Sequence, residues 1–260
     1  VVLIIVESLR ADQLVVYGSP RTVMPTVESL AQRSLVFRNT WAQSSHTSYA
    51  VFAPLSSHYP LRSITRHVYP KNASYPRVMV YDVLKSLGYV TAAFSSSNEN
   101  WEGMINYLQT DNLDKLFHAA VAEEQTVIHE EDSGFAGWAK QLGQRGSLDD
   151  RLTVTKAIEW LESQTHSPFF VYLNLQSAHL PYRIPSDFPR QFGPEALDFT
   201  IRFGYFPRNK AKTVKDVYAD SLAYVDAQIS RMVEFLTRRN LTKDTIIVVT
   251  GDHGQAFYEH

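Results

Sequence analysis

The chain has 260 residues, 44% of them hydrophobic, which is enough to bury one large core. Its 25 Lys and Arg residues nearly balance its 27 Asp and Glu residues, and the net charge of -2 argues against a nucleic-acid or anionic-membrane surface. The absence of cysteine excludes disulfides, Cys-ligated zinc and a Cys nucleophile. No apolar run approaches the roughly 18 residues that a membrane-spanning helix needs.

Short apolar runs alternate with amphipathic stretches along the chain. The apolar runs are rich in β-branched residues and predict strands that are covered on both faces of a parallel sheet. The amphipathic stretches have helical periodicity. The expected strands are 1–6, 89–94, 169–174 and 245–250, and the expected helices are 78–87, 150–164 and 213–238. This alternation predicts a doubly wound α/β fold, with a mostly parallel sheet, helices on both faces and one domain over 1–260.

Local signals support the helix boundaries. Gly88 stands where a helix ending near residue 87 needs a left-handed residue. Asp149 or Asp150 can cap the second helix. The proline-interrupted segment 183–212 predicts a surface excursion rather than a linker between domains. The third helix places eight apolar side chains on one face: Val214, Val217, Tyr218, Leu222, Val225, Ile229, Val233 and Leu236.

Both ends of the sequence are abrupt. It starts inside a buried-strand pattern, without an initiator Met or a targeting segment, and it stops at Glu259-His260. We therefore expect an excised domain, truncated at its C-terminus, with any membrane anchor outside the chain.

Acidic and histidine side chains follow the first and last predicted strands. Glu7 comes directly after the first strand, and Asp252 and His253 come directly after the last. Ligands of open α/β sheets bind beyond the carboxyl ends of the strands, so these residues would meet if the two strands are neighbours. A carboxylate beside an imidazole suits a divalent metal. The alternative is structural, with Asp252 capping a turn and Glu7 paired with Arg10.

A cluster of hydroxyl side chains at 44–48 precedes a helix-compatible run that extends to residue 56. A hydroxyl at a helix N-terminus faces unpaired N–H groups that favour a bound anion. A Thr hydroxyl is a weak nucleophile that metal coordination can activate. Such a cluster is also typical of an ordinary turn and cap.

Several segments, taken in order, resemble the alkaline phosphatase superfamily in its sulfatase-like branch. The resemblance extends over essentially the whole chain. The matching segments are 7–12, 17–18, 24–31, 87–92, 169–181, 218–226 and 245–254.

The nucleophile loop departs from the sulfatase pattern. The resemblance places Thr47 where sulfatases have the Cys or Ser that becomes formylglycine, and the Pro and Arg of that motif are absent. Thr cannot become formylglycine, so ordinary sulfatase chemistry is not expected. The first metal loop has Glu7-Ser8 where sulfatases have two Asp residues.

A leading Glu and a Thr nucleophile are instead similar to lipoteichoic acid synthases and phosphoethanolamine transferases. That resemblance implies one divalent metal held by Glu7, Thr47, Asp252 and His253, with Thr47 forming a covalent phospho-enzyme. The donor set suits Mn or Mg, relatives hold Zn, and Ca fits less well.

The same resemblance assigns residues around the metal. His179 is expected to bind the substrate anion or to protonate the leaving group, as a catalytic and substrate-binding residue. Trp101 and the nearby Asn98 are expected to contact substrate, and so is His46 beside the nucleophile. A core position for Trp101 and a solvent-facing position for His179 are the alternatives.

The expected function is transfer of a phospho-alcohol group, such as phosphoglycerol or phosphoethanolamine, from lipid or glycan phosphodiesters. Hydrolysis of phosphodiesters or sulfate esters and a non-catalytic lipid-binding role are the alternatives. The resemblance implies a phospholipid or glycan-linked substrate, no nucleic-acid partner, and work at the outer face of a bacterial cytoplasmic membrane.

Overall fold

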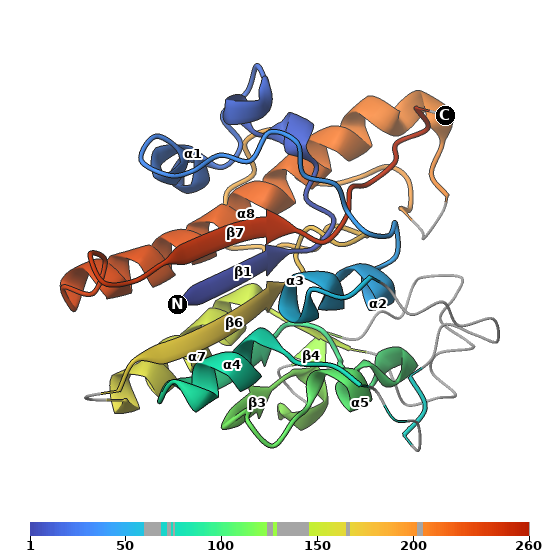
Figure 1. Cartoon of the computed structure of the whole chain (residues 1–260). Helices are drawn as coiled ribbons and strands as arrows, with labels where there is room; N and C mark the ends of the chain where they lie inside the picture. Colours follow the sequence, from blue (N-terminus) through green and yellow to red (C-terminus); the bar gives the residue numbers. More distant parts are fainter. Residues whose placement is uncertain are drawn as a thin grey trace.

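A computed structural model describes residues 1–59, 69–71, 74, 76–123, 127–128, 146–164, 167–201 and 205–259. Its centre is a five-stranded sheet in the order β3-β2-β6-β1-β7, in which every neighbouring pair is parallel (Figure 1). The strands are β1 (Val2–Val6), β2 (Val90–Ser95), β3 (Lys115–Phe117), β6 (Phe169–Leu175) and β7 (Ile247–Gly251). A separate antiparallel pair joins β4 (Val127–Ile128) to β5 (Ser147–Leu148).

The pairing of β1 decides where the polar loops lie. It pairs with β6 on one side and with β7 on the other, and the register places Val6 beside both Leu175 and Gly251. The three strands therefore end at the same level, and the residues that follow them emerge together. The sequence-based condition that the first and last strands be neighbours is confirmed.

Helices cover both faces of the sheet, as predicted. One face packs against α7 (Asp150–Ser163) and α8 (Ala211–Arg238), and α1 (Pro25–Ala31) packs on α8. The opposite face packs against α3 (Phe52–Ser56), α4 (Val80–Ser86) and α5 (Met104–Leu108), with α2 (Thr47–Ala50) leading into α3. Side chains alternate along β1, so Val2, Ile4 and Val6 enter the first core and Leu3 and Ile5 the second.

The three predicted helices are confirmed, with boundaries that agree to within two residues. Gly88 follows α4 with a φ of 87°, the left-handed conformation expected there. Asp149 caps α7 by accepting a hydrogen bond from the Arg151 N–H, whereas Asp150 is fully buried. Seven of the eight residues expected on the apolar face of α8 are buried, and Val233 is half-buried.

The excursion after β6 has no long helix or strand in its described part. Asp220 of α8 holds it by accepting hydrogen bonds from the backbone N–H groups of Gln191, Phe192 and Gly193. Short 3-10 helices complete the described structure, at Ala11–Gln13, Val15–Tyr17, Trp101–Gly103, Ala119–Val121 and Arg208–Lys210.

A second carboxylate of α8 caps a neighbouring helix. Met24 precedes α1 and supplies no side-chain cap, and Pro25 has no N–H to satisfy. Asp226 accepts hydrogen bonds from Thr26 N at 2.9 Å and Val27 N at 3.0 Å. The cap of α1 therefore comes from a residue 200 positions away in sequence.

We expect Asp226→Ala to lower the free energy of unfolding by about 2 kcal/mol, because it leaves two amides at the start of α1 without an acceptor. Denaturant unfolding measures the change. Asp244→Ala removes an exposed carboxylate and is the control, expected to shift stability by less than about 0.5 kcal/mol. Equal stability of the two variants would contradict this role of Asp226.

Candidate active site and metal centre

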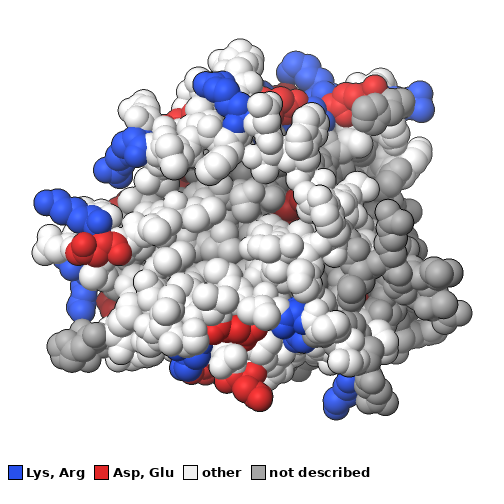
Figure 2. Space-filling model, in the orientation of Figure 1, with Lys and Arg blue, Asp and Glu red and all other residues white. Residues whose placement is uncertain are grey.

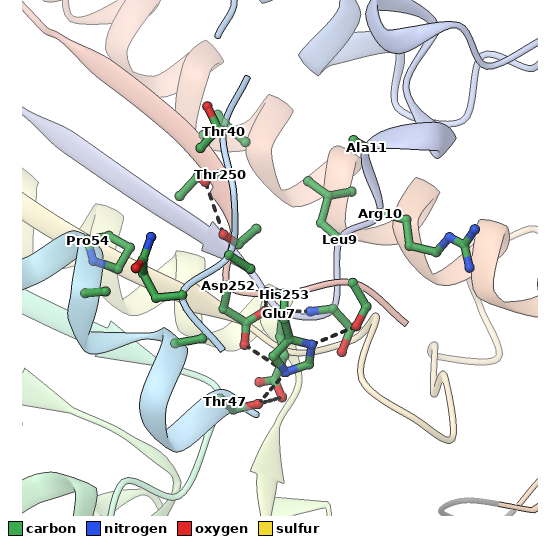
Figure 3. A pocket seen from close by; sticks show the side chains of 18 of the residues that line it. Glu7, Leu9, Arg10, Ala11, Thr40, Thr47, Pro54, Thr250, Asp252 and His253 are labelled. Atoms are coloured by element: carbon green, nitrogen blue, oxygen red, sulfur yellow. Dashed lines mark hydrogen bonds and ion pairs between the residues drawn. The ribbon is translucent and has the colours of Figure 1, made fainter. Parts of the chain in front are cut away.

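Three ionisable side chains converge beyond the carboxyl ends of β1 and β7 (Figure 3). Glu7 follows β1, and Asp252 and His253 follow β7. One ligand atom from each lies within 4.8 Å of the other two. Glu7 is 1% exposed and Asp252 is 3% exposed, so both carboxylates are removed from bulk water.

Thr47 enters the cluster from the opposite side, as the first residue of α2. Its hydroxyl donates a hydrogen bond to Glu7 Oε1 at 2.9 Å, and it lies 3.0 Å from His253 Nε2. Thr47 is 8% exposed. The structure thus brings together the four residues expected to hold a metal.

The two oxygens of Asp252 have different surroundings. Oδ1 accepts hydrogen bonds from the backbone N–H groups of Ser8, at 2.8 Å, and His253, at 2.7 Å. Oδ2 is buried, has no hydrogen-bond partner among the described residues, and lies 3.4 Å from His253 Nε2. One oxygen is therefore used to fix the carboxylate and the other is directed into the cluster.

His253 directs an acceptor atom, Nε2, toward Asp252 Oδ2. Its Nδ1 lies 2.8 Å from the carbonyl oxygen of Gly254, and because a carbonyl only accepts, Nδ1 carries the proton. In the neutral ring the Nε2 lone pair then faces Asp252 Oδ2 and Thr47. Two acceptors in contact repel each other unless a cation lies between them, so this donor set fits a divalent metal.

The pKa of Glu7 is raised to about 7, mainly by burial and also by the Asp252 carboxylate, while His179, His253 and the Thr47 hydroxyl act in the opposite direction. The ionised form of Glu7 is therefore expensive here without a nearby positive charge. A bound divalent cation would supply that charge.

Gln176 holds the second oxygen of Glu7. It follows β6, and its side-chain amide donates a hydrogen bond to Glu7 Oε2. Glu7 Oε1 is left to accept from Thr47. Gln176 was not among the predicted site residues, although the rule that selected Glu7, a polar residue directly after a buried strand, also selects Gln176.

The loop after β1 is fastened to α8. Ser8 has a φ of 59°, its N–H donates to Asp252, and its carbonyl accepts from the Tyr218 hydroxyl at 2.6 Å. Tyr218 Oη in turn accepts from Arg10 N at 3.0 Å. Tyr218 was expected only to pack on the apolar face of α8, and the helical pattern gave no signal for its hydroxyl.

Arg10 holds the outer part of this loop and points away from the cluster (Figure 3). Its guanidinium forms an ion pair with Asp12 at 2.5 Å and with Glu259 at 2.8 Å. It also donates to the carbonyl of Gln255 at 2.7 Å. The alternative pairing of Arg10 with Glu7 is not found among the described contacts.

His179 lies at the edge of the cluster. Its Nε2 is 3.5 Å from Glu7 Oε1, and its Nδ1 is 2.7 Å from the carbonyl of Leu180. The carbonyl makes Nδ1 the N–H donor and turns Nε2 toward the site. The side chain is 33% exposed, so it can reach a bound substrate from this position.

Three further predicted residues lie along one wall of a groove of about 2680 Å³ that contains Thr47. His46 stacks on Trp101 with ring centroids 5.5 Å apart and an interplanar angle of 18°. His46 Nδ1 also lies 3.0 Å from Ser48 Oγ. Trp101 is half-buried, and Asn98 is 6% exposed and borders the same groove. Their contact with substrate stays a prediction.

On the side shown in Figure 2, the Lys and Arg side chains of the described residues are scattered along the margins and interleaved with acids. Among the described residues, no helix combines the length and apolar composition that crossing a bilayer requires.

Comparison with known proteins identifies the family. The sulfatase family model matches residues 1–260, and the chain belongs to that family. Human iduronate 2-sulfatase is 27% identical, with the match covering 100% of this chain and 55% of that protein. Lipoteichoic acid synthase 2 of Bacillus subtilis is 25% identical over 97% of this chain and 35% of its own length. The chain thus spans about half of the sulfatase relative and about a third of the synthase.

Solved structures agree on the fold. The lipoteichoic acid synthase LtaP from Listeria monocytogenes superposes with a TM-score of 0.70 at 21% identity, covering 98% of this chain and 56% of that one. The C-terminal periplasmic domain of EptC from Escherichia coli, in complex with Zn, gives a TM-score of 0.63 at 17% identity, covering 100% and 64%.

We expect Gln176→Ala to weaken binding of Mn²⁺ or Zn²⁺ by about 10- to 100-fold, because it releases the carboxylate of Glu7 from its fixed orientation. Isothermal titration of metal-stripped protein measures the affinity. Asp252→Ala is expected to weaken it further, and Gln109→Ala, at an exposed site, is the control. Unchanged affinity in both Gln176→Ala and Asp252→Ala would contradict the assigned centre.

Proposed function

We propose that the protein transfers a phospho-alcohol group through a covalent phosphate ester on Thr47. The observation that supports this proposal is the position of the Thr47 hydroxyl, hydrogen-bonded to Glu7 and in contact with His253 inside the metal-ligand cluster. An ordinary structural Thr at a helix start would bond to its own backbone instead. Thr47 does not cap α2 in this way.

The donor set proposed for one divalent cation is Glu7, Thr47, Asp252 and His253. When bound, such a cation supplies positive charge that favours the alkoxide form of a hydroxyl and stabilises negative phosphoryl oxygens. Mn, Mg and Zn are all compatible with two carboxylates, a hydroxyl and an imidazole, whereas Ca prefers an all-oxygen set. The Zn complex of EptC makes Zn a realistic occupant.

The first half-reaction begins at the Thr47 hydroxyl. The proton leaves toward Glu7 Oε1, the acceptor it already contacts at 2.9 Å. Thr47 Oγ1 then forms a bond to phosphorus as the bond to the departing alcohol oxygen breaks. His179, protonated at Nε2, donates a proton to that oxygen.

The second half-reaction reverses these roles. His179 Nε2 is now neutral and accepts the proton of an incoming hydroxyl, which attacks the phosphorus of phospho-Thr47. The bond between phosphorus and Thr47 Oγ1 breaks, and the oxygen recovers a proton from Glu7. An alcohol acceptor gives transfer, and water gives hydrolysis.

The substrate is proposed to be a lipid- or glycan-linked phosphodiester. One lipoteichoic acid synthase resembles the chain in sequence, and a second synthase and a phosphoethanolamine transferase resemble it in fold. These resemblances support such a substrate. The periplasmic location stated for the EptC domain supports work outside the cytoplasm, at the outer face of a bacterial membrane. His46, Asn98 and Trp101 would contact the alcohol portion along the groove wall.

Sulfate-ester hydrolysis is the second candidate, because iduronate 2-sulfatase is among the relatives. Thr47 disfavours it. The formylglycine of sulfatases is made from Cys or Ser, and the chain contains no Cys and has Thr at the nucleophile position. A phosphoryl acceptor needs only a hydroxyl at this point.

We expect Thr47→Ala to reduce turnover of a model phosphodiester by at least about 10³-fold, because the covalent route is lost. Thr47→Ser keeps the hydroxyl and is expected to retain measurable activity. Steady-state kinetics on metal-loaded protein provides the comparison, and mass spectrometry of quenched reactions is expected to find phosphate ester on residue 47.

Thr40→Ala is a matched control, because Thr40 borders the same groove without joining the cluster. Its activity is expected to equal that of the wild type. Full activity of Thr47→Ala, or turnover of sulfate esters with phosphodiesters untouched, would overturn the proposal. With active wild-type protein, adding glycerol or a lipid alcohol and analysing the products separates transfer from hydrolysis.

A further inference from the structure

A fully buried carboxylate lies outside the metal cluster, beneath the wall of the groove. Glu99 is 0% exposed and belongs to the loop that follows β2. It forms no ion pair with Lys, Arg or His within the described part of the chain. A buried carboxylate without a countercharge is costly in its ionised form.

Among the described residues, the hydrogen-bond partners of this carboxyl are neutral. Its Oε1 accepts from the Ser95 hydroxyl at 2.5 Å and lies 3.5 Å from Asn174 Nδ2. Its Oε2 has no hydrogen-bond partner among the described residues. Asn174 Oδ1 and the Tyr172 hydroxyl are also buried without a described partner, and both belong to β6, the strand that pairs with β2.

The described titratable groups around Glu99 do not supply a positive charge. His118 Nδ1 accepts a hydrogen bond from Glu99 N at 3.2 Å, and burial lowers the pKa of His118 to about 4, so the ring is neutral near pH 7. Tyr172 and Tyr81 are neutral phenols whose pKa values are raised by burial. Burial likewise raises the pKa of Glu99, against the smaller opposing effects of Ser95 and Asn174.

We propose that Glu99 is an uncharged carboxylic acid that pairs with β6 and positions the loop bearing Asn98 and Trp101. A proton on Oε2 gives this oxygen a donor, and Asn174 Oδ1 and the Tyr172 hydroxyl are the buried acceptors available to it. The Asn174 amide then meets the acid at two points, donating to Oε1 and accepting from Oε2.

The loop that bears Asn98 and Trp101 contains residues with positive φ, a strained conformation that surrounding contacts must hold. Glu102 has a φ of 51° and Gly103 a φ of 72°, and a Cβ on Gly103 would lie 2.2 Å from the carbonyl oxygen of Tyr69. The backbone of Glu99 makes two further hydrogen bonds: its N–H donates to His118 Nδ1, and its carbonyl accepts from Ile105 N at 2.7 Å. The role of this loop toward substrate rests on the proposed function, whereas the protonation state of Glu99 does not.

The protonation state is tested by infrared difference spectroscopy of metal-loaded wild type and Glu99→Gln at pH 8. A neutral acid gives the C=O band of a protonated carboxyl group, which is expected in the wild type and absent from the variant. Identical spectra in this region would overturn the proposal, because they would mean that Glu99 is ionised. This measurement does not depend on any catalytic activity.

The anchoring role is tested by comparing Glu99→Gln with Glu99→Ala. Gln can donate to Asn174 and accept from it, so Glu99→Gln is expected to melt within about 2 °C of wild type, whereas Glu99→Ala is expected to melt about 4 to 8 °C lower. Glu162→Ala, at an exposed position of α7, is the control. A Glu99→Gln protein as unstable as Glu99→Ala would overturn the pairing.

Kinetics separates positioning from simple stability. At a temperature where all variants are folded, Glu99→Ala is expected to raise KM for the diester about tenfold with a smaller change in kcat. Glu99→Gln is expected to have the KM of the wild type. Unchanged KM in Glu99→Ala would contradict the positioning role. If wild type itself turns over no ester, the proposed function fails, and the infrared and melting results still decide the state of Glu99.

Discussion

The pairing of β1 with β6 on one side and β7 on the other is the constraint on which the site depends. Parallel pairing brings the carboxyl ends of the three strands to one level, so Glu7, Gln176 and Asp252 emerge as neighbours although they are far apart in sequence. The apolar faces of β1 hold this register, because a slip by one residue would turn its buried side chains to the wrong core.

The cost of this arrangement is two buried carboxylates side by side. Glu7 and Asp252 have no ion pair with Lys or Arg among the residues that the structure describes. Each instead has one oxygen fixed by N–H donors, from Gln176 for Glu7 and from backbone amides for Asp252. The remaining oxygens face Thr47 and His253, where a divalent cation fits. For Glu99, the proposed way to avoid a buried negative charge is protonation of the carboxylate rather than a bound cation.

The sequence predicted the sheet strands and helices that have strong periodicity, and it predicted Glu7, Asp252 and His253 because they follow strands. Thr47 was selected within the hydroxyl cluster only by the family resemblance. The sequence did not predict β3, which has only three residues, or α1, whose cap comes from Asp226 on another helix. The partners Gln176 and Tyr218 were missed for a related reason. Their roles depend on which side-chain atom meets which loop, and hydrophobic periodicity holds no information on such contacts.

Thr47 reaches the cluster from α2, whereas the other three residues follow strands of the sheet. The proposed nucleophile and the proposed metal ligands on the sheet therefore belong to separable parts of the chain. A change confined to one short helix can exchange the proposed nucleophile without altering strand register or the loops after β1 and β7. Such a division of labour lets evolution vary the ester under attack while the scaffold stays fixed, in keeping with a family whose relatives include both a sulfatase and lipoteichoic acid synthases.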